Sequence, residues 1–135
     1  MNSQMRWRQR LESYGRMLSL LDAAINEAET TTRSIVRDGT IKRFEMTLEL
    51  AWKTLKDYLI WQGIGGSTGG ARTVIKEAFA ADLLPNAQLW IEMLETRNTV
   101  THCYDVAVFE VAYRRIEEAY LAELTTLHTR LLGEV

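Results

Sequence analysis

Apolar residues recur along this chain at alternating spacings of three and four, the period of an α-helix with one buried face. The first stripe predicts a helix of about seven turns. Its members are Trp7, Leu11, Tyr14, Leu18, Leu21, Ile25 and Ala28. A second stripe begins after the polar, flexible segment Asp38-Gly39-Thr40 and predicts a helix from near Thr40 to about Gln62. It consists of Ile41, Phe44, Leu48, Ala51, Leu55 and Tyr58.

Residues 63–70 hold five of the eight glycines. Glycine loses much backbone entropy in a helix, so this run predicts a loop. The apolar pattern that follows it indicates a short helix ending before Pro85, the single proline. Asn86 is then a suitable N-cap for the next helix.

Two more stripes complete the pattern. The third consists of Trp90, Leu94, Arg97, Thr101 and Tyr104, and so passes from apolar into polar residues. Asp105 is a candidate N-cap for the fourth. This last stripe comprises Val106, Phe109, Tyr113, Ile116, Tyr120, Leu124, Leu127 and Leu131. We therefore predict an all-α fold, an antiparallel up-and-down four-helix bundle with one short additional helix, in a single domain over residues 1–135.

Composition narrows the classes of partner. The 135 residues carry 16 Lys plus Arg and 18 Asp plus Glu, for a net charge of −2. This balance gives no general attraction to nucleic acid or to an anionic membrane, so any RNA site must be a local basic patch. With one cysteine, no secretory segment and no long apolar run, the chain is expected to be a cytoplasmic protein without a disulfide.

Two common chemistries do not fit the sequence. The glycine run resembles a phosphate loop in the spacing of Gly65 and Gly70, but Ala71-Arg72 stands where Lys-Ser/Thr is required, which favours a flexible linker. A helical-bundle di-metal site needs Glu three residues before a histidine. Both histidines, His102 and His128, have threonine there. We therefore expect neither a metal nor a cofactor.

Charged residues also follow one face of the second helix. Glu45, Glu49, Lys53 and Asp57 are each four apart, a pattern typical of a solvated face with weak ion pairs. We favour that interpretation, although Arg43 and Glu49 could border a pocket.

Arg97 occupies a stripe position where an aliphatic residue is expected. An unpaired buried guanidinium is costly, so Arg97 needs a carboxylate, a phosphate ligand or a watery cleft such as a dimer interface. His102 lies about 140° further round an ideal helix, so the two share a site only at its flank or at a helix break. An arginine that binds phosphate and a histidine that moves a proton are the minimum for cleaving RNA at a 2′-hydroxyl without metal.

Two segments give the sequence a family resemblance. One is Arg43-Phe44-Glu45 with Glu49-Leu50-Ala51-Trp52-Lys53-Thr54-Leu55-Lys56-Asp57-Tyr58. The other is Arg97-Asn98 followed by Thr101-His102 and Tyr104-Asp105. Together they resemble the nucleotidyltransferase substrate-binding family of the HEPN superfamily, which includes the HepT-type ribonuclease toxins. The glycine-rich loop departs from the family, which more often has a shorter turn there.

The resemblance implies a homodimer whose Arg-x4-His elements face one cleft, and a separate minimal nucleotidyltransferase as antitoxin-like partner. It implies that Arg97 and His102 are the catalytic pair for RNA cleavage. Asn98 is a candidate for orienting the substrate. The expected function is a toxin-like endoribonuclease; the alternative is a non-catalytic subunit that holds substrate or nucleotide for the partner.

The resemblance also makes Tyr104 the residue that the partner modifies with AMP. Tyr104 lies seven residues after Arg97, which is about 20° of rotation on a continuous helix. If the third helix continues that far, both side chains emerge on the same side.

Overall fold

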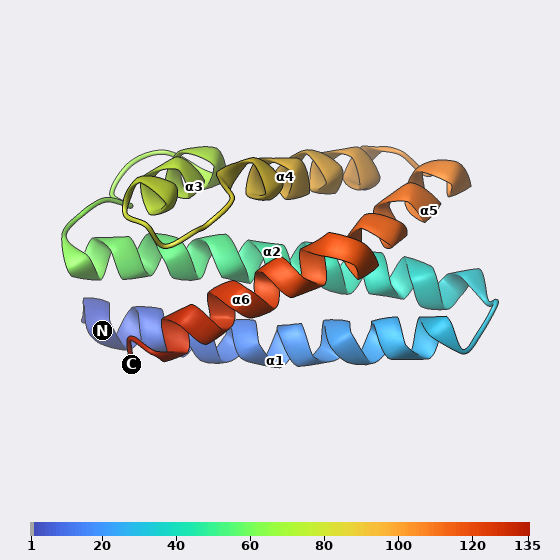
Figure 1. Ribbon diagram of the computed structural model, residues 1–135, viewed down its shortest axis with the longest axis horizontal. Helices are drawn as coiled ribbons and strands as arrows, with labels where there is room; N and C mark the ends of the chain where they lie inside the picture. Colours follow the sequence, from blue (N-terminus) through green and yellow to red (C-terminus); the bar gives the residue numbers. More distant parts are fainter. Residues whose placement is uncertain (1) are drawn as a thin grey trace.

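The computed structural model describes residues 2–135, and all of its regular elements are helical. The elements are α1 (Ser3–Glu29), α2 (Ser34–Gln62), α3 (Ala71–Ala80), α4 (Ala87–His102), α5 (Val106–Arg115), the π-helical turn η1 (Ile116–Tyr120) and α6 (Leu121–Leu132). Figure 1 shows α1, α2, α4 and the α5–α6 segment running in alternating directions, with α3 in the crossover before α4. The predicted all-α bundle with one short extra helix is confirmed.

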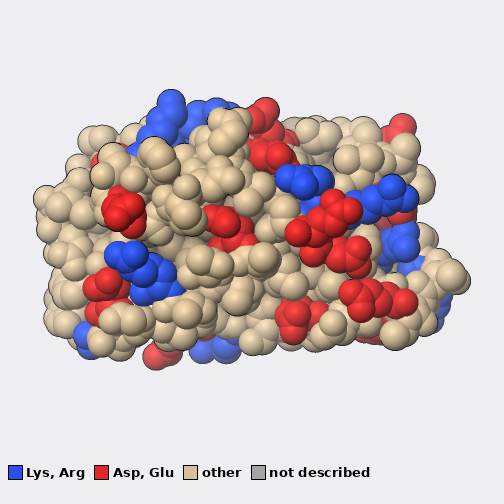
Figure 2. Space-filling model, in the orientation of Figure 1, with Lys and Arg blue, Asp and Glu red and all other residues tan. Residues whose placement is uncertain are grey.

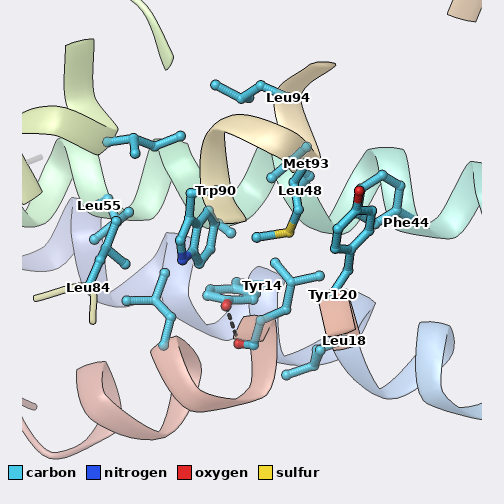
Figure 3. Packing of buried hydrophobic residues seen from close by; sticks show 14 of the residues in the cluster. Tyr14, Leu18, Phe44, Leu48, Leu55, Leu84, Trp90, Met93, Leu94 and Tyr120 are labelled. Atoms are coloured by element: carbon cyan, nitrogen blue, oxygen red, sulfur yellow. Dashed lines mark hydrogen bonds between the residues drawn. The ribbon is translucent and has the colours of Figure 1, made fainter. Parts of the chain in front are cut away.

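The core is built from the predicted stripes. Every member of the first two stripes is buried, as are Trp90 and Leu94 of the third. The Tyr14 hydroxyl of α1 donates to the carbonyl of Leu124, and Phe44 of α2 stacks on Tyr120 at 5.3 Å between ring centroids. Figure 3 shows these three aromatic rings within the core. Aromatic and aliphatic side chains from all the long helices therefore fill one continuous interior.

The predicted start of the second helix near Thr40 is wrong, because α2 begins at Ser34. Gly39 stands inside the helix, with open space at the position that a Cβ atom would occupy. The Thr40 hydroxyl is buried and donates to the carbonyl of Val36 at 2.8 Å, so its polar group is satisfied within the helix. Packing against α1 outweighs the unfavourable helix propensity of Asp38-Gly39-Thr40.

The loop and the caps agree with the sequence. Gly63 ends α2 in the left-handed conformation at φ 71°, and residues 63–70 contain no helix. The side chains of Asn86 and Asp105 accept hydrogen bonds from Leu89 and Ala107 at the starts of α4 and α5. These N-caps fix where α4 and α5 begin, and hence where the segment between them lies.

The last helix is less regular than predicted. Its stripe is buried from Tyr113 to Leu131, but Val106 at the start is exposed and the π-turn η1 interrupts the helix. The α5–α6 segment crosses α1 and α2 obliquely (Figure 1). Among residues 2–135, no helix combines the length and apolar character needed to span a membrane.

Candidate functional site

The candidate residues lie at the C-terminal end of α4. Arg97 and Asn98 are on the turn before its last, and His102 is its final residue. Cys103 then adopts an extended conformation. The expectation that the helix continues to Tyr104 is therefore wrong, because Asp105 must start α5 only a few residues later. Tyr104 stands in the short connection between the two helices.

Arg97 is partly buried, with 25% of its side chain exposed. Its Nη1 donates to Oε2 of Glu49 on α2 at 3.3 Å, and its Nη2 donates to Oδ1 of Asn98 at 3.2 Å. A guanidinium at this position needs a carboxylate, a phosphate ligand or a watery cleft, and the structure supplies the carboxylate. Both hydrogen bonds are at the long end of the normal range, so this pairing is loose.

Glu49 is shared among several donors. Its Oε2 accepts from the indole Nε1 of Trp52 at 3.0 Å, and its Oε1 lies 3.0 Å from the Nζ of Lys53. Burial alone would raise the pKa of Glu49, but these hydrogen bonds and the charges of Lys53 and Arg97 outweigh it and lower the pKa below its ordinary value. Arg97 thus faces a stable carboxylate that is already held by two closer donors.

A hollow of about 500 Å³ opens between α2 and α4 beside this pair; we call it the α2–α4 hollow. Its lining includes Glu45 and Glu49 of α2 and Arg97 and Thr101 of α4. The Thr101 hydroxyl donates to the carbonyl of Arg97 at 2.7 Å and lies 3.4 Å from Oε1 of Glu45. The hollow gives a ligand access to the guanidinium from solvent.

The predicted solvated face of α2 is correct for Glu49 and Lys53, which are half-exposed and form the expected ion pair, and it is wrong for Asp57. Glu45 and Glu49 contact α4, and Asp57 is buried and paired with Arg10 of α1 at 2.8 Å. The regular spacing of four indicates that these residues share one face of the helix. It does not indicate which other helices cover that face. Glu49 does border a hollow, whereas Arg43 donates to the carbonyl of Leu20 on α1.

His102, Asn98 and Tyr104 are all exposed near the end of α4. Among the described residues, no hydrogen bond or ion pair joins His102 to Arg97. Tyr104 is 86% exposed, so its phenolic oxygen is accessible from outside the bundle. The fold brings the four predicted residues to one end of α4 without binding them into a closed network. Within residues 2–135, no three His, Cys, Asp or Glu side chains are grouped to hold a metal ion.

Comparisons with known proteins agree with this fold. The family model described as nucleotidyltransferase substrate binding protein like matches residues 9–132. A "Probable ribonuclease HepT" of Haemophilus influenzae is 29% identical over 133 residues, spanning 84% of this chain and 90% of that protein.

Two solved structures are similar. HI0074 of Haemophilus influenzae, described as having the fold of a substrate binding domain of a nucleotidyltransferase, has a TM-score of 0.81 at 22% identity and covers 90% of this chain and 98% of its own. The protein ttk003001694 of Thermus thermophilus has a TM-score of 0.70 at 27% identity, over 90% and 97% of the two chains.

Proposed function

The chain belongs to the nucleotidyltransferase substrate binding protein like family, and from that premise we propose that it is a metal-independent endoribonuclease. It acts as a dimer and is silenced by a separate minimal nucleotidyltransferase, as the toxin of a toxin–antitoxin pair. The observation that carries this proposal is the state of Arg97, which is loosely paired, open to the α2–α4 hollow, and on the same helix end as an exposed histidine. The relative named as a probable ribonuclease supports it.

In the proposed reaction, His102 takes the proton from a ribose 2′-hydroxyl, whose oxygen attacks the adjacent phosphorus. The bond to the 5′-oxygen of the next nucleotide breaks, and His102 returns its proton to that oxygen, which leaves a 2′,3′-cyclic phosphate and a 5′-hydroxyl. Arg97 binds the phosphate and offsets its developing negative charge. Asn98, whose amide contacts Arg97, orients the substrate.

The proposal is tested by incubating the purified protein with structured and with single-stranded RNA in EDTA, beside His102→Ala. We expect fragments from the wild type and none from the variant. His102 is exposed at a helix end, so the variant should keep the wild-type thermal midpoint. Equal cleavage by both proteins would reject the assignment.

The proposed dimer places Arg97 and His102 near their symmetry mates. Three large apolar side chains close after His102 support an interface there, since Tyr104, Val106 and Val111 are 86%, 73% and 65% exposed. A mostly apolar hollow of about 510 Å³ between α4 and α5 adjoins them, with Val111 in its wall. We expect a solution mass of two chains at micromolar concentration. A mass of one chain would contradict this.

Tyr104 is the proposed point of control. Its phenolic oxygen would bond to the α-phosphorus of ATP as pyrophosphate leaves, and the attached AMP would place negative charge and a bulky nucleoside beside the RNA site. The high exposure of Tyr104 suits an enzyme that must reach it. Mass spectrometry after co-expression with the nucleotidyltransferase should find AMP on Tyr104. An unmodified Tyr104 in fully silenced protein would reject this modification as the mechanism. The partner would then silence the protein by covering the RNA site.

The alternative function is a non-catalytic subunit that holds substrate or nucleotide for the nucleotidyltransferase. The ion pair between Arg97 and Glu49 favours this alternative, because the arginine already has a carboxylate partner. The two functions differ in one result. A holding subunit binds nucleotide or RNA and leaves the RNA intact under the conditions given above.

A further inference from the structure

A row of three neighbouring hollows follows α2. The first, about 490 Å³, lies beside the glycine-rich loop, and Gly66 and Ser67 form part of its wall. The second, about 370 Å³, shares Arg6 and Arg10 of α1 with the first. It also shares Leu50 of α2 with the α2–α4 hollow that contains Arg97. The three therefore neighbour one another along α2, from the loop to Arg97.

The end of this row near the loop is strongly basic. Arg6, Arg10, Lys53 and Lys56 line its first hollow against a single carboxylate, that of Asp57. We call these four residues the basic tract. The whole chain has a net charge of −2, and the face in Figure 2 has acidic and basic side chains interspersed. The tract is thus a local concentration of positive charge, as an RNA site on this chain requires.

Two of the four cations, Arg10 and Lys53, have a carboxylate partner, and the other two are open to an external anion. Asp57 holds Nε of Arg10 at 2.8 Å, which fixes the guanidinium while its two terminal nitrogens make no hydrogen bond within the described residues. Lys53 reaches Glu49 at 3.0 Å and so joins the tract to the Arg97 pair. No ion pair within residues 2–135 involves Arg6 or Lys56.

An aromatic side chain lies among these cations. Trp52 lines the first hollow, and the Nζ of Lys53 is 6.0 Å from its ring centroid. Its indole nitrogen is held by Glu49, which fixes the ring. Cations that follow a backbone beside an aromatic face are the combination by which proteins bind single-stranded nucleic acid.

We propose that the basic tract binds the phosphates of a single RNA strand whose cleaved linkage lies at Arg97. This inference rests on the proposed ribonuclease function and adds the path of its substrate. Lys56 stands seven residues from Glu49, about 10 Å along α2. A strand in the tract therefore holds phosphates next to the reactive one, and Trp52 stacks on a base between them.

The test measures binding separately from cleavage. A fluorescent RNA with 2′-O-methyl groups throughout has no attacking hydroxyl, so its anisotropy reports binding alone. The tract variant is Arg6→Ala with Lys56→Ala, and the matched control is Arg72→Ala with Lys76→Ala on α3. The control removes the same charges from exposed positions that line none of the three hollows.

We expect the tract variant to bind RNA more weakly across sequences, with the slope of log K against log salt reduced by about 1.4, or about 0.7 for each lost phosphate contact. The control variant and His102→Ala should bind like the wild type. His102→Ala separates binding from chemistry. A wild-type protein that binds the 2′-O-methyl RNA but cuts no unmodified RNA would reject the ribonuclease and retain the tract.

Three results would overturn the inference. The first is an equal loss of affinity in the tract and control variants, which would indicate a general charge effect. The second is no binding of the 2′-O-methyl RNA by the wild type. The third is unchanged RNA binding with lost binding of the nucleotidyltransferase, which would make the tract a surface for that partner.

Discussion

Helix α4 makes two arginine–glutamate pairs with its neighbours, and they differ in how firmly they are held. Near its start, Glu92 accepts from Nε of Arg115 at 2.8 Å and from the Tyr120 hydroxyl at 2.6 Å. Near its end, Arg97 reaches Glu49 at 3.3 Å, after Trp52 and Lys53 have taken the closer positions. The first pair is a closed network that joins helices. The second leaves its arginine loosely bound.

The short hydrogen bonds around Glu92 also shift the pKa values of their partners. Burial, and then the hydrogen bond to Glu92, raise the pKa of Tyr120 to about 12, while the hydrogen bond from Arg115 lowers the pKa of Glu92. Thr96 completes this network through a 2.8 Å contact with the Tyr120 hydroxyl. The short hydrogen bonds around Glu92 stabilise the bundle, whereas an arginine with long hydrogen bonds is free to exchange them for a phosphate.

The largest effect is expected from removing the loosely held arginine. Arg97→Ala should lower RNA cleavage by about 10²- to 10⁴-fold, because the phosphate loses its charged donor. Its thermal midpoint should stay near that of the wild type. Arg115→Ala should give the reverse, with lower stability and unchanged cleavage for each folded molecule. Single-turnover rates measure cleavage and thermal melts measure stability. Loss of cleavage in Arg115→Ala but not in Arg97→Ala would show that Arg115, and not Arg97, serves the reaction.

The closed network is tested by Tyr120→Phe. Tyr120 is fully buried and its hydroxyl serves a carboxylate, so the free energy of unfolding should fall by about 1.5 to 3 kcal/mol. The matched control is Tyr113→Phe, whose hydroxyl makes a longer bond of 3.3 Å to Glu117 and should matter less. Urea denaturation measures both. Equal falls in the free energy of unfolding of the two variants would show that the network around Glu92 stabilises the bundle no more than the longer bond of Tyr113 does.

The loose pair is tested by Glu49→Gln. The variant keeps an oxygen acceptor for Trp52 and Arg97 but removes a negative charge from the RNA path. Binding of 2′-O-methyl RNA should tighten by about 1 kcal/mol, or about fivefold. Glu92→Gln should leave RNA affinity unchanged. Weaker binding by Glu49→Gln would mean that the carboxylate positions Arg97 for RNA and does not compete with it.

The smallest effect concerns the two histidines, which differ as the two pairs do. His102 is exposed, whereas His128 packs on Tyr14 at 5.2 Å between ring centroids and burial lowers its pKa. The unfolded chain then binds the proton more readily, so this stabilising contribution is complete above pH 6.5 and is lost as the pH falls below it. Thermal midpoints between pH 7 and 5 should fall less steeply in His128→Gln. An unchanged slope would show that His128 is not the group responsible.

Local signals in the sequence explain what could be predicted. The first two stripes and the caps Asn86 and Asp105 depend on residues a few positions apart, and the structure has them where they are expected. The start of α2 at Ser34 was missed because packing against α1 stabilises a segment of poor helix propensity.

Contacts between distant residues explain what could not be predicted. Arg97 meets Glu49 across 48 positions, and Arg10 meets Asp57 across 47. No spacing rule connects such pairs, so the basic tract becomes visible only when α1 and α2 are placed side by side. The π-turn η1 coincides with the one break in the alternation of the last stripe, where Ile116, Tyr120 and Leu124 follow at two successive spacings of four.

If Arg97 and His102 cleave RNA through its own 2′-hydroxyl, as proposed, the reaction fixes the chemistry of the two cut ends. An RNA cut by the wild type in EDTA should yield a 2′,3′-cyclic phosphate and a 5′-hydroxyl, and a single 2′-deoxy substitution at the cut position should abolish that cut. A cut that persists at the deoxy position, or one that leaves a 5′-phosphate, would contradict the account.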